Sequence, residues 1–475
     1  RSERGRQILE RILPAIFASL ARQSDPDLAF SRFDAFLGGF SAGVQVLSLF
    51  ERNPASIARV AAVLGSAPAL ADHFVRHPDA LAGLLNDEET ETTPPARILR
   101  ARMTGSQGLE DTIGIVGRAV READFAIAVA TMESRIDADE AGRRRTAWVD
   151  AAVTSLFRAA MADFVARNGR VVGGAMAVVL LGKAGGRETM YGSDLDLMLI
   201  YDHPETVAES RGARRMPAGL WFVRAAHAVV AAITARGIDG PLYEVDMRLR
   251  PSGNKGPVAT QFRAFEAYQR DEAETWEHMA LTRARVIHGP PDLVERLNRT
   301  VRATLCRTRD AATLVRDVAD MRDRIAQHAP PRSLWDFKHL PGGLFDIDFV
   351  AQYLALRHAA ARPDILHPHP AEMLRRAASA GFVGQSDAER LRSARLLMSD
   401  VQGLLRLTLD GDEATFDEAK APEGQQRLIA ATEDEPDIGA LRRRVETERA
   451  AARAIYERIV EAPARAAGWK ARSET

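Results

Sequence analysis

Two aspartates, Asp194 and Asp196, stand two residues apart at the start of the apolar run Leu195–Ile200. The run has the length and composition of a buried strand, in which residues i and i+2 share one face. Two carboxylates on one face repel each other unless a cation lies between them, and their oxygens suit a divalent metal ion. The glycine-rich segment Gly182–Gly186, just upstream, is suited to a phosphate. The pattern therefore predicts a cation beside a phosphate.

The segment Tyr243–Arg250 alternates strictly between polar and apolar residues, which is typical of a strand. Its polar face carries Glu244, Asp246, Arg248 and Arg250. An edge strand with a solvated outer face would explain this pattern without any chemistry. If the segment instead pairs beside the first strand, Asp246 becomes a third carboxylate of the same site, with two arginines further along.

Three carboxylates, a glycine turn and basic side chains are together the parts required for nucleotidyl transfer with two Mg²⁺ ions. One ion lowers the pKa of the attacking hydroxyl, and the other binds the triphosphate and stabilises the departing pyrophosphate. Arginine and lysine spread the charge that develops during the reaction. The third carboxylate is also placed to accept the proton of the nucleophile.

The elements that must position these residues divide the chain into three regions. Residues 1–165 show apolar positions three and four apart and predict helices that pack on a catalytic unit. Residues 166–290 contain the strands and form the catalytic domain, and residues 291–475 return to helices as a carboxy-terminal bundle. The strands are expected at Ala175–Leu181, Asp194–Tyr201 and Leu242–Leu249, with a helix at Ala218–Arg236. The fold class is α+β, mostly α, with a small mixed sheet flanked by helical bundles.

The composition narrows the classes of function. At 475 residues, two or three domains are expected. Lys and Arg total 64 against 65 Asp and Glu, and this balance argues against a dedicated nucleic-acid binder. The single cysteine, Cys306, fits a reducing compartment. Since no signal-like opening and no apolar run of spanning length appear, we expect a cytoplasmic protein without a membrane partner.

The choice of cations is unusual, because only five of the 64 basic residues are lysines. Three of them, Lys183, Lys255 and Lys338, lie in short glycine-rich segments. Compositional bias could have left them there at random. Alternatively, these sites require a compact ammonium group rather than a planar guanidinium.

Further pairs of polar residues have simpler explanations. Arg283 and Arg285 are expected on a helix surface, with a role at the substrate as the alternative. Asp346 and Asp348 follow a glycine pair, and i and i+2 do not share a face of a helix. They are therefore interpreted as charges favoured at a helix N-terminus rather than as a metal site. His369, in a proline-rich loop, is expected to face solvent.

The glycine pair, the Asp-x-Asp strand and the later aspartate together resemble the polymerase-β-like nucleotidyltransferase superfamily. Longer blocks resemble the glutamine synthetase adenylyltransferase family in particular. These blocks are Leu181–Leu197, Glu244–Val258, Phe265–Gln269, Thr275–His278 with Arg283–Arg285, and Lys338–Phe349. Within the last block, Asp348 stands where the family pattern has glutamate.

Members of this family are bifunctional, and the resemblance implies one of two activities for this chain. Their amino-terminal unit removes AMP from glutamine synthetase by phosphorolysis, and their carboxy-terminal unit transfers AMP from ATP to a tyrosine. The chain carries one set of motifs, and Tyr191–Asp196 and Arg250–Asn254 resemble the carboxy-terminal, adenylylating unit. The deadenylylating unit is the alternative within the family. A helical regulatory module that binds nucleotide or effector without turnover is the alternative of another class, against which the intact aspartates argue.

The resemblance also implies a set of site residues and partners. Asp194, Asp196 and Asp246 would be the catalytic carboxylates and the ligands of two Mg²⁺ ions, with ATP as substrate. Gly185 and Gly186 would let the backbone approach the phosphates. The remaining nucleotide-site residues would be Lys183, Arg187, Arg248 and Arg250 as phosphate contacts, with Ser193 capping the turn into the strand. The implied partners are glutamine synthetase, the nitrogen-regulatory PII protein and glutamine as an effector.

Overall fold

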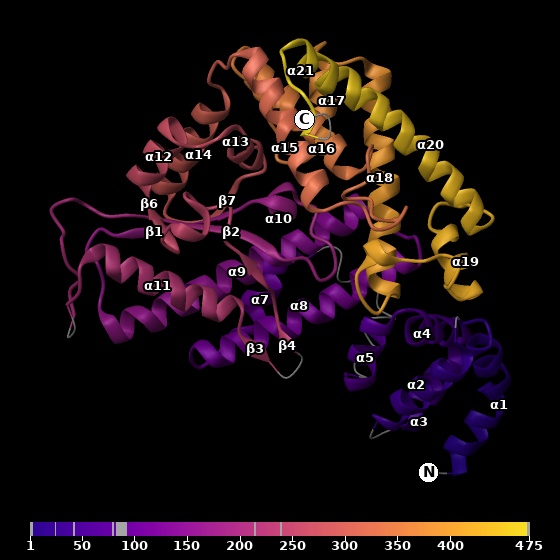
Figure 1. Ribbon diagram of the computed structural model, residues 1–475. Helices are drawn as coiled ribbons and strands as arrows, with labels where there is room; N and C mark the ends of the chain where they lie inside the picture. Colours follow the sequence, from indigo (N-terminus) through magenta and orange to yellow (C-terminus); the bar gives the residue numbers. More distant parts are fainter. Residues whose placement is uncertain are drawn as a thin grey trace.

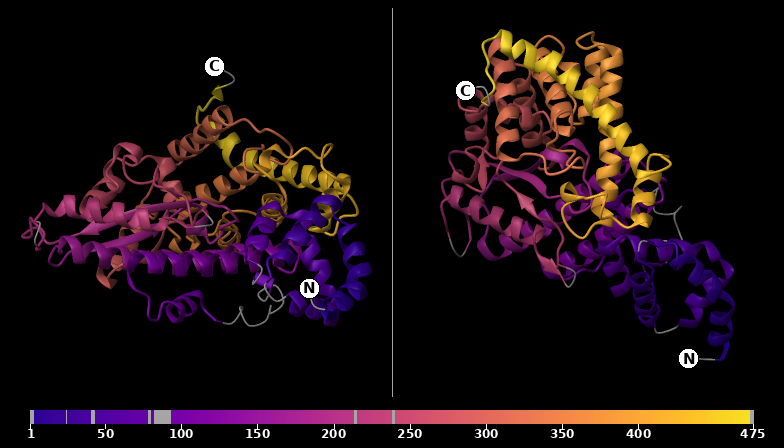
Figure 2. Two further views of the ribbon diagram at one scale, coloured as in Figure 1. Left: turned by 90° about the horizontal axis from the view of Figure 1, so that it is seen from below. Right: turned by 45° about the vertical axis from the view of Figure 1, so that its right-hand side comes forward.

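The computed structural model shows a mostly helical protein built around one small sheet, as the sequence predicts (Figure 1). It describes residues 3–23, 25–40, 43–77, 80–81, 93–212, 215–237 and 240–472. The amino-terminal helices form a lobe at one end of the molecule, the sheet lies at the other end, and the carboxy-terminal helices lie above both (Figure 2).

The amino-terminal lobe consists of five helices with an aromatic core. They are α1 (Glu3–Leu20), α2 (Pro26–Gly38), α3 (Gly43–Arg52), α4 (Pro54–Ser66) and α5 (Pro68–Arg76). Phe36 and Phe74 are both fully buried, with ring centroids 4.4 Å apart. Phe74 also lies 5.1 Å from Phe125, which belongs to the next group of helices. This contact attaches the lobe to the rest of the protein.

Two long helices lead from the lobe to the sheet. After the short α7 (Pro95–Arg102), α8 (Gly108–Met132) and α9 (Ala138–Asn168) run side by side beneath the sheet (Figure 1). The side chain of Asp137 accepts a hydrogen bond from the backbone N–H of Glu140 and so begins α9. Within the described residues, no single helix is long and apolar enough to cross a membrane; only α4 and α5 together meet the criteria, across a 119° bend.

The sheet is built around β2 (Leu195–Asp202), which is hydrogen-bonded on both sides. On one side it pairs antiparallel with β1 (Ala175–Leu180), which in turn pairs with β7 (Arg285–His288). On the other side it pairs in parallel with β5 (Val245–Asp246) and β6 (Ala259–Gln261). The predicted first and second strands are confirmed to within one residue.

Both faces of the sheet are buried. Val178 and Leu180 of β1 face α9 and α11 (Ala218–Ile233), whereas Ala177 and Val179 face the helices on the other side. These helices are α12 (Phe262–Asp271), α13 (Thr275–Leu281) and α14 (Pro291–Leu305). Because strand side chains alternate between faces, those of β1 pack into two hydrophobic cores. This explains why the sequence of β1 is almost uninterruptedly apolar.

The predicted strand Leu242–Leu249 is wrong in length, because only Val245 and Asp246 pair with β2. The chain then turns, and the guanidinium of Arg250 donates to the carbonyls of Met247 and Pro257. These bonds hold the turn, and β6 takes the next position along β2. The predicted helix Ala218–Arg236 likewise ends early, at Ile233, since Arg236 pairs with Pro241 in the β3 (Arg236–Gly237) and β4 (Gly240–Pro241) hairpin.

The carboxy-terminal helices complete the fold. They are α15 (Ala311–His328), α16 (Leu344–His358), α17 (Pro370–Ser379), α18 (Gln385–Thr408), α19 (Glu423–Ala431), α20 (Ile438–Tyr456) and α21 (Ala462–Ala466). α18 contacts α16, α17 and α20 and also reaches α5, α8 and α9. It therefore connects the carboxy-terminal helices to those of the amino-terminal region. The region boundaries at 165 and 290 stay a prediction.

Candidate functional site

The predicted carboxylates line a cavity of about 480 Å³ between the sheet and the carboxy-terminal helices. The sheet region contributes Asp194, Asp196 and Asp246 to the lining. Cations from several segments line the same cavity. The basic side chains that line the cavity are Lys183, Arg248, Arg283, Lys338, Arg395 and Arg406.

Strand pairing brings the carboxylates together. Asp196 of β2 is the direct partner of Asp246 of β5 in the parallel register, and Asp194 precedes β2 by one residue. Burial, and then the negative charges of Asp246 and Asp194, raise the pKa of Asp196 to about 6. The electrostatics therefore confirm that the three carboxylates are close enough to repel one another.

A glycine makes room for this cluster. Gly182 begins the short helix α10 (Gly182–Gly186) with φ of +52°, and a Cβ at this position would overlap the Oδ2 atom of Asp196. The backbone N–H of Leu181 donates to the carbonyl of Asp196 over 2.9 Å. Glycine is thus required here both by the backbone angle and by the approach of the carboxylate.

Asp246 is held by an arginine two residues along the chain. Arg248 donates to Asp246 from its backbone N–H and from its Nε, both over 2.8 Å. These hydrogen bonds hold the pKa of Asp246 below its usual value. In this arrangement, no three His, Cys, Asp or Glu side chains of the described residues are placed to hold a metal ion together.

The donor set nevertheless fits a divalent cation such as Mg²⁺. Asp194, Asp196 and Asp246 supply only carboxylate oxygens, the ligands that Mg²⁺ prefers. Burial, and then the charges of Asp246 and Asp194, raise the pKa of Asp196, so its charged form is disfavoured while no cation is bound. A bound cation would relieve this repulsion once Asp246 turns from Arg248.

The structure gives Gly185 and Gly186 a packing role. A Cβ on Gly185 would overlap the backbone carbonyl of Arg283, and one on Gly186 would overlap the side chain of Glu188. Both glycines let α10 lie directly against the segment that carries Arg283. Their role in the approach of phosphates stays a prediction.

Lys183, Lys338 and Arg406 come from three segments of the cavity lining and are called the basic wall below. Lys183, on α10, is half-buried, with its Nζ atom 3.3 Å from the sulfur of Met190. Burial, and then the charges of Arg406 and Lys338, lower the pKa of Lys183 to about 7. Lys338 lies before α16, with its ammonium 5.3 Å from the ring centre of Phe345. Among the described residues, Lys183 and Lys338 are the lining cations without a carboxylate partner.

Sequence reasoning missed part of this basic wall. Arg406, on α18, pairs with Glu413 over 2.9 Å and donates to the carbonyl of Tyr191. Nothing in its local sequence marks it. The scarcity of lysine did single out Lys338, but not its position in the cavity of the carboxylates. Lys255, singled out in the same way, lines a different hollow beside Tyr268.

Two predicted residues, Arg187 and Arg250, have other positions than expected, whereas Ser193 has the expected one. Arg187 ends α10 in the left-handed conformation, is exposed and does not line the cavity. Arg250 is buried and directed at backbone carbonyls, so it stabilises its own turn. Ser193 accepts a hydrogen bond from the N–H of Met190 over 3.0 Å, as expected for a residue that caps the turn.

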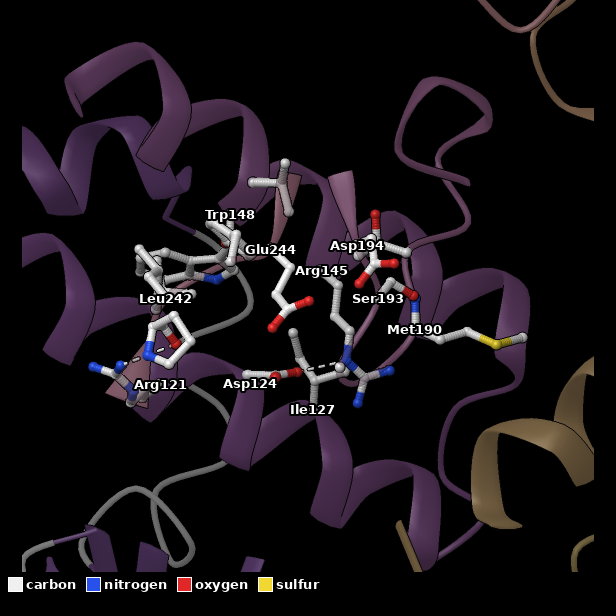
Figure 3. A pocket seen from close by; sticks show the side chains of 16 residues that line it. Arg121, Asp124, Ile127, Arg145, Trp148, Met190, Ser193, Asp194, Leu242 and Glu244 are labelled. Atoms are coloured by element: carbon white, nitrogen blue, oxygen red, sulfur yellow. Dashed lines mark hydrogen bonds and ion pairs between the residues drawn. The ribbon is translucent and has the colours of Figure 1, made fainter. Parts of the chain in front are cut away.

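A second hollow of about 370 Å³ also has Asp194 in its lining (Figure 3). It is lined by α8, α9 and the segment before β5. Arg145 pairs with Asp124 over 2.5 Å, and Trp148 and Glu244 lie opposite them. Asp194 lines both hollows, whereas Asp196 and Asp246 line only the first of the two.

Paired carboxylates on adjacent parallel strands, in one cavity with a basic wall, define a protein of the nucleotidyltransferase class. The comparisons with known proteins agree. The chain belongs to the glutamate-ammonia ligase adenylyltransferase family, whose model matches residues 57–300. Residues 293–460 match a second model, GlnD PII-uridylyltransferase. The resemblance inferred from the sequence is thereby confirmed.

Nearly the whole of this chain aligns with about half of each of two relatives. It is 37% identical over 462 residues to a bifunctional glutamine synthetase adenylyltransferase/adenylyl-removing enzyme of Rhodopseudomonas palustris strain TIE-1, covering 96% of this chain and 46% of the relative. A protein of the same description from Rhizobium meliloti strain 1021 is 37% identical over 468 residues, covering 97% and 47%. The chain thus spans about half the length of the curated relatives it matches.

Proposed function

We propose that this chain is an adenylylating unit, which transfers AMP from ATP to a tyrosine of glutamine synthetase and so regulates nitrogen assimilation. The observation that carries the proposal is the parallel pairing of Asp196 with Asp246 in a cavity that Lys183 and Lys338 also line. The acidic cluster that would bind metal and the cations that would bind phosphate therefore line one space.

The residues divide the chemistry between them. Mg²⁺ held by Asp194, Asp196 and Asp246 would lower the pKa of the attacking phenol and neutralise part of the triphosphate. Lys183, Lys338 and Arg406 would bind the β- and γ-phosphates and stabilise the charge of the pyrophosphate as it leaves. A bond forms between the tyrosine oxygen and the α-phosphorus as the bond to the β-phosphate oxygen breaks. Asp246, freed from Arg248, is placed to accept the phenolic proton.

The direction of transfer is supported by the local motifs and by the charge of the wall. Tyr191–Asp196 and Arg250–Asn254 resemble the adenylylating unit of the family. Three cations in the same cavity as the carboxylates also suit a triphosphate, which carries more charge than the single phosphate used in phosphorolysis. The proposed effectors are glutamine and the PII protein, and the match of residues 293–460 to a PII-uridylyltransferase model supports regulation through the carboxy-terminal helices.

Purified protein, α-labelled ATP, Mg²⁺ and unmodified glutamine synthetase test the proposal, with and without glutamine. We expect label on the acceptor and one pyrophosphate per transfer, and loss of both in Asp194→Asn with the fold intact. If adenylylated glutamine synthetase and phosphate instead yield ADP while ATP yields no label, the chain is the deadenylylating unit. Full activity of Asp194→Asn would remove the metal assignment.

A further inference from the structure

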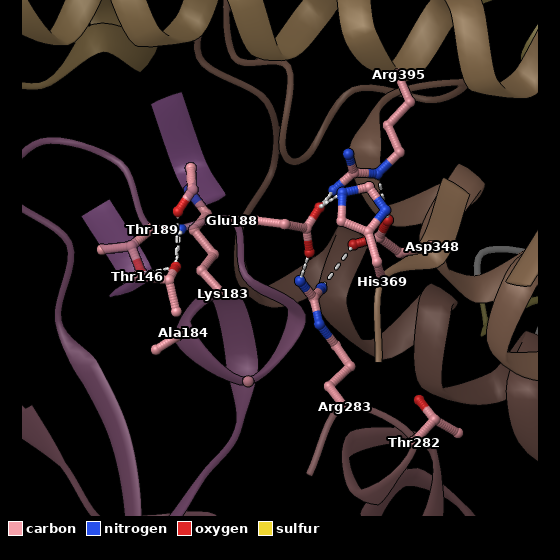
Figure 4. A network of polar contacts seen from close by, with 12 residues as sticks. Thr146, Lys183, Ala184, Glu188, Thr189, Thr282, Arg283, Asp348, His369 and Arg395 are labelled. Atoms are coloured by element: carbon pink, nitrogen blue, oxygen red, sulfur yellow. Dashed lines mark hydrogen bonds and ion pairs between the residues drawn. The ribbon is translucent and has the colours of Figure 1, made fainter. Parts of the chain in front are cut away.

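A ring of four buried charged residues lies in the cavity wall (Figure 4). Arg283 pairs with Glu188 and with Asp348, and Arg395 pairs with the same two acids. Asp348 offers one oxygen to each arginine, over 3.1 Å to Arg283 and 3.2 Å to Arg395. Positive and negative charges therefore alternate around a closed circuit.

The ring is largely buried. The side chains of Glu188, Arg283 and Arg395 are at most 10% exposed, and that of Asp348 is 14% exposed. His369 adjoins the ring, with its Nε2 atom 3.7 Å from Glu188 and 3.3 Å from Asp139. The sequence predicts Arg283 on a helix surface and His369 facing solvent. Both predictions are wrong, because both side chains are largely buried. Buried charges persist when they are fully paired, because a lone one has no water to solvate it.

Each member of the ring comes from a different segment. Glu188 follows α10, Arg283 precedes β7, Asp348 lies on α16 and Arg395 lies on α18. The ring thus joins the sheet with its glycine helix to two helices of the carboxy-terminal bundle. It also unites residues from three of the sequence blocks that carry the family resemblance.

Three of these segments also carry a cation of the basic wall. The N–H of Glu188 donates to the carbonyl of Lys183 over 2.8 Å, so these two residues move together. The N–H of Leu344 donates to the carbonyl of Phe337 over 2.7 Å and fastens the turn of Lys338 to the start of α16. Arg395 and Arg406 lie on the same helix, α18.

We propose that Glu188, Arg283, Asp348 and Arg395 are positioning residues, whose ring sets the distance of Lys183, Lys338 and Arg406 from the catalytic carboxylates. The ring fixes that distance because paired buried charges tolerate fewer arrangements than an apolar contact does. This inference rests on the proposed function and adds to it the recognition of the β- and γ-phosphates. The ring itself carries no net charge, so its effect on a nucleotide passes through the three cations.

Calorimetric binding of ATP and of AMP, both with Mg²⁺, tests the ring apart from turnover. AMP lacks the two phosphates that the basic wall would bind. We expect Asp348→Asn, Glu188→Gln and Arg395→Lys to weaken ATP binding at least tenfold and to leave AMP binding within twofold. Asp348→Glu, which keeps the carboxylate and has the residue type of the family pattern, should keep the ATP preference.

Asp202→Asn is the matched control. Asp202 ends the strand that carries Asp196, is 18% exposed and pairs with Arg296 over 2.7 Å, outside the cavity. This variant should lower the melting temperature without changing the ratio of ATP to AMP affinity. If the folded ring variants keep that ratio, or lose both nucleotides equally, the ring is merely structural and the inference is wrong. If the wild type shows no preference for ATP, the proposed function fails instead.

Discussion

Gly182 lies directly against the carboxylate of Asp196, at the point where α10 begins. The contact joins the glycine-rich segment to the acidic strand more closely than the sequence indicates. It shows that the first glycine of the segment, rather than Gly185 or Gly186, faces the carboxylates.

Gly182→Ala should therefore lower transfer activity by about 100-fold, because the new methyl group displaces Asp196 by about an ångström or more. The left-handed backbone adds a cost of about 1–2 kcal/mol. Gly381→Ala is the control, since Gly381 has φ of +78° but open space around its Cβ. It should lose similar stability and keep its activity. Steady-state kinetics and thermal melts compare the two variants, and equal activities would show that the contact with Asp196 is dispensable.

Mg²⁺ binding should weaken about tenfold per pH unit below about 6, because a proton on Asp196 then competes with the metal ion. Without Mg²⁺, the raised pKa of Asp196 means that folding favours its protonated form. The stability that protonated Asp196 contributes to the folded protein is therefore lost as the pH rises through about 6. The rise in melting temperature on adding Mg²⁺ should consequently be larger at pH 7.5 than at pH 5.5. Asp196→Asn should abolish this difference, and a rise that is independent of pH would contradict the assignment.

ATP binding should be coupled to uptake of a proton above pH 7, because Lys183 is partly neutral there and binds phosphate as the ammonium form. Calorimetry at pH 8 in two buffers of different ionisation enthalpy measures this uptake. Lys183→Met should remove it and weaken ATP binding about tenfold or more. Proton uptake that survives in Lys183→Met would have to come from another group.

The sequence predicts phosphate contacts for both Arg248 and Arg250, but substitution should affect stability at Arg250 and Mg²⁺ binding at Arg248. Arg250→Ala should destabilise the protein by about 2–3 kcal/mol, because buried carbonyls of the turn lose their donor. Arg248→Ala should leave the melting temperature nearly unchanged, since Arg248 is 74% exposed, and should lower the Mg²⁺ concentration for half-maximal binding by freeing Asp246. Thermal melts with a Mg²⁺ titration separate the two, and equal destabilisation would contradict this division.

The sequence is sufficient for the parts of the site that depend on local pattern. Asp196 and Asp246 lie on strands whose apolar residues define them, and their pairing follows from one small sheet. The spacing of apolar residues likewise predicts the helical flanks. Local sequence does not predict that the strand ends at Asp246, because this end depends on hydrogen bonds from Arg250 to carbonyls such as that of Pro257, further along the chain.

The rest of the cavity lining could not be predicted because it depends on tertiary packing. Arg406 lies far along the chain from Asp194, on a helix whose surface pattern is ordinary. Arg283 and Asp348 each have a plausible local explanation, as a surface charge and as a helix-terminal charge. Only their contact across two elements shows that they belong together. The lysine count gave the one compositional signal, at Lys183 and Lys338.

Helix α18 links the ring to Arg406, one of the cations that we propose to bind phosphates. Arg395 and Arg406 lie 11 residues apart on this helix, which is a span of about 16 Å. A tilt of about 5° around Arg395 would move Arg406 by about 1.4 Å, a displacement large enough to change a reaction rate substantially. A partner that binds the far end of α18 and tilts the helix would therefore change the position of the Arg406 charge in the cavity.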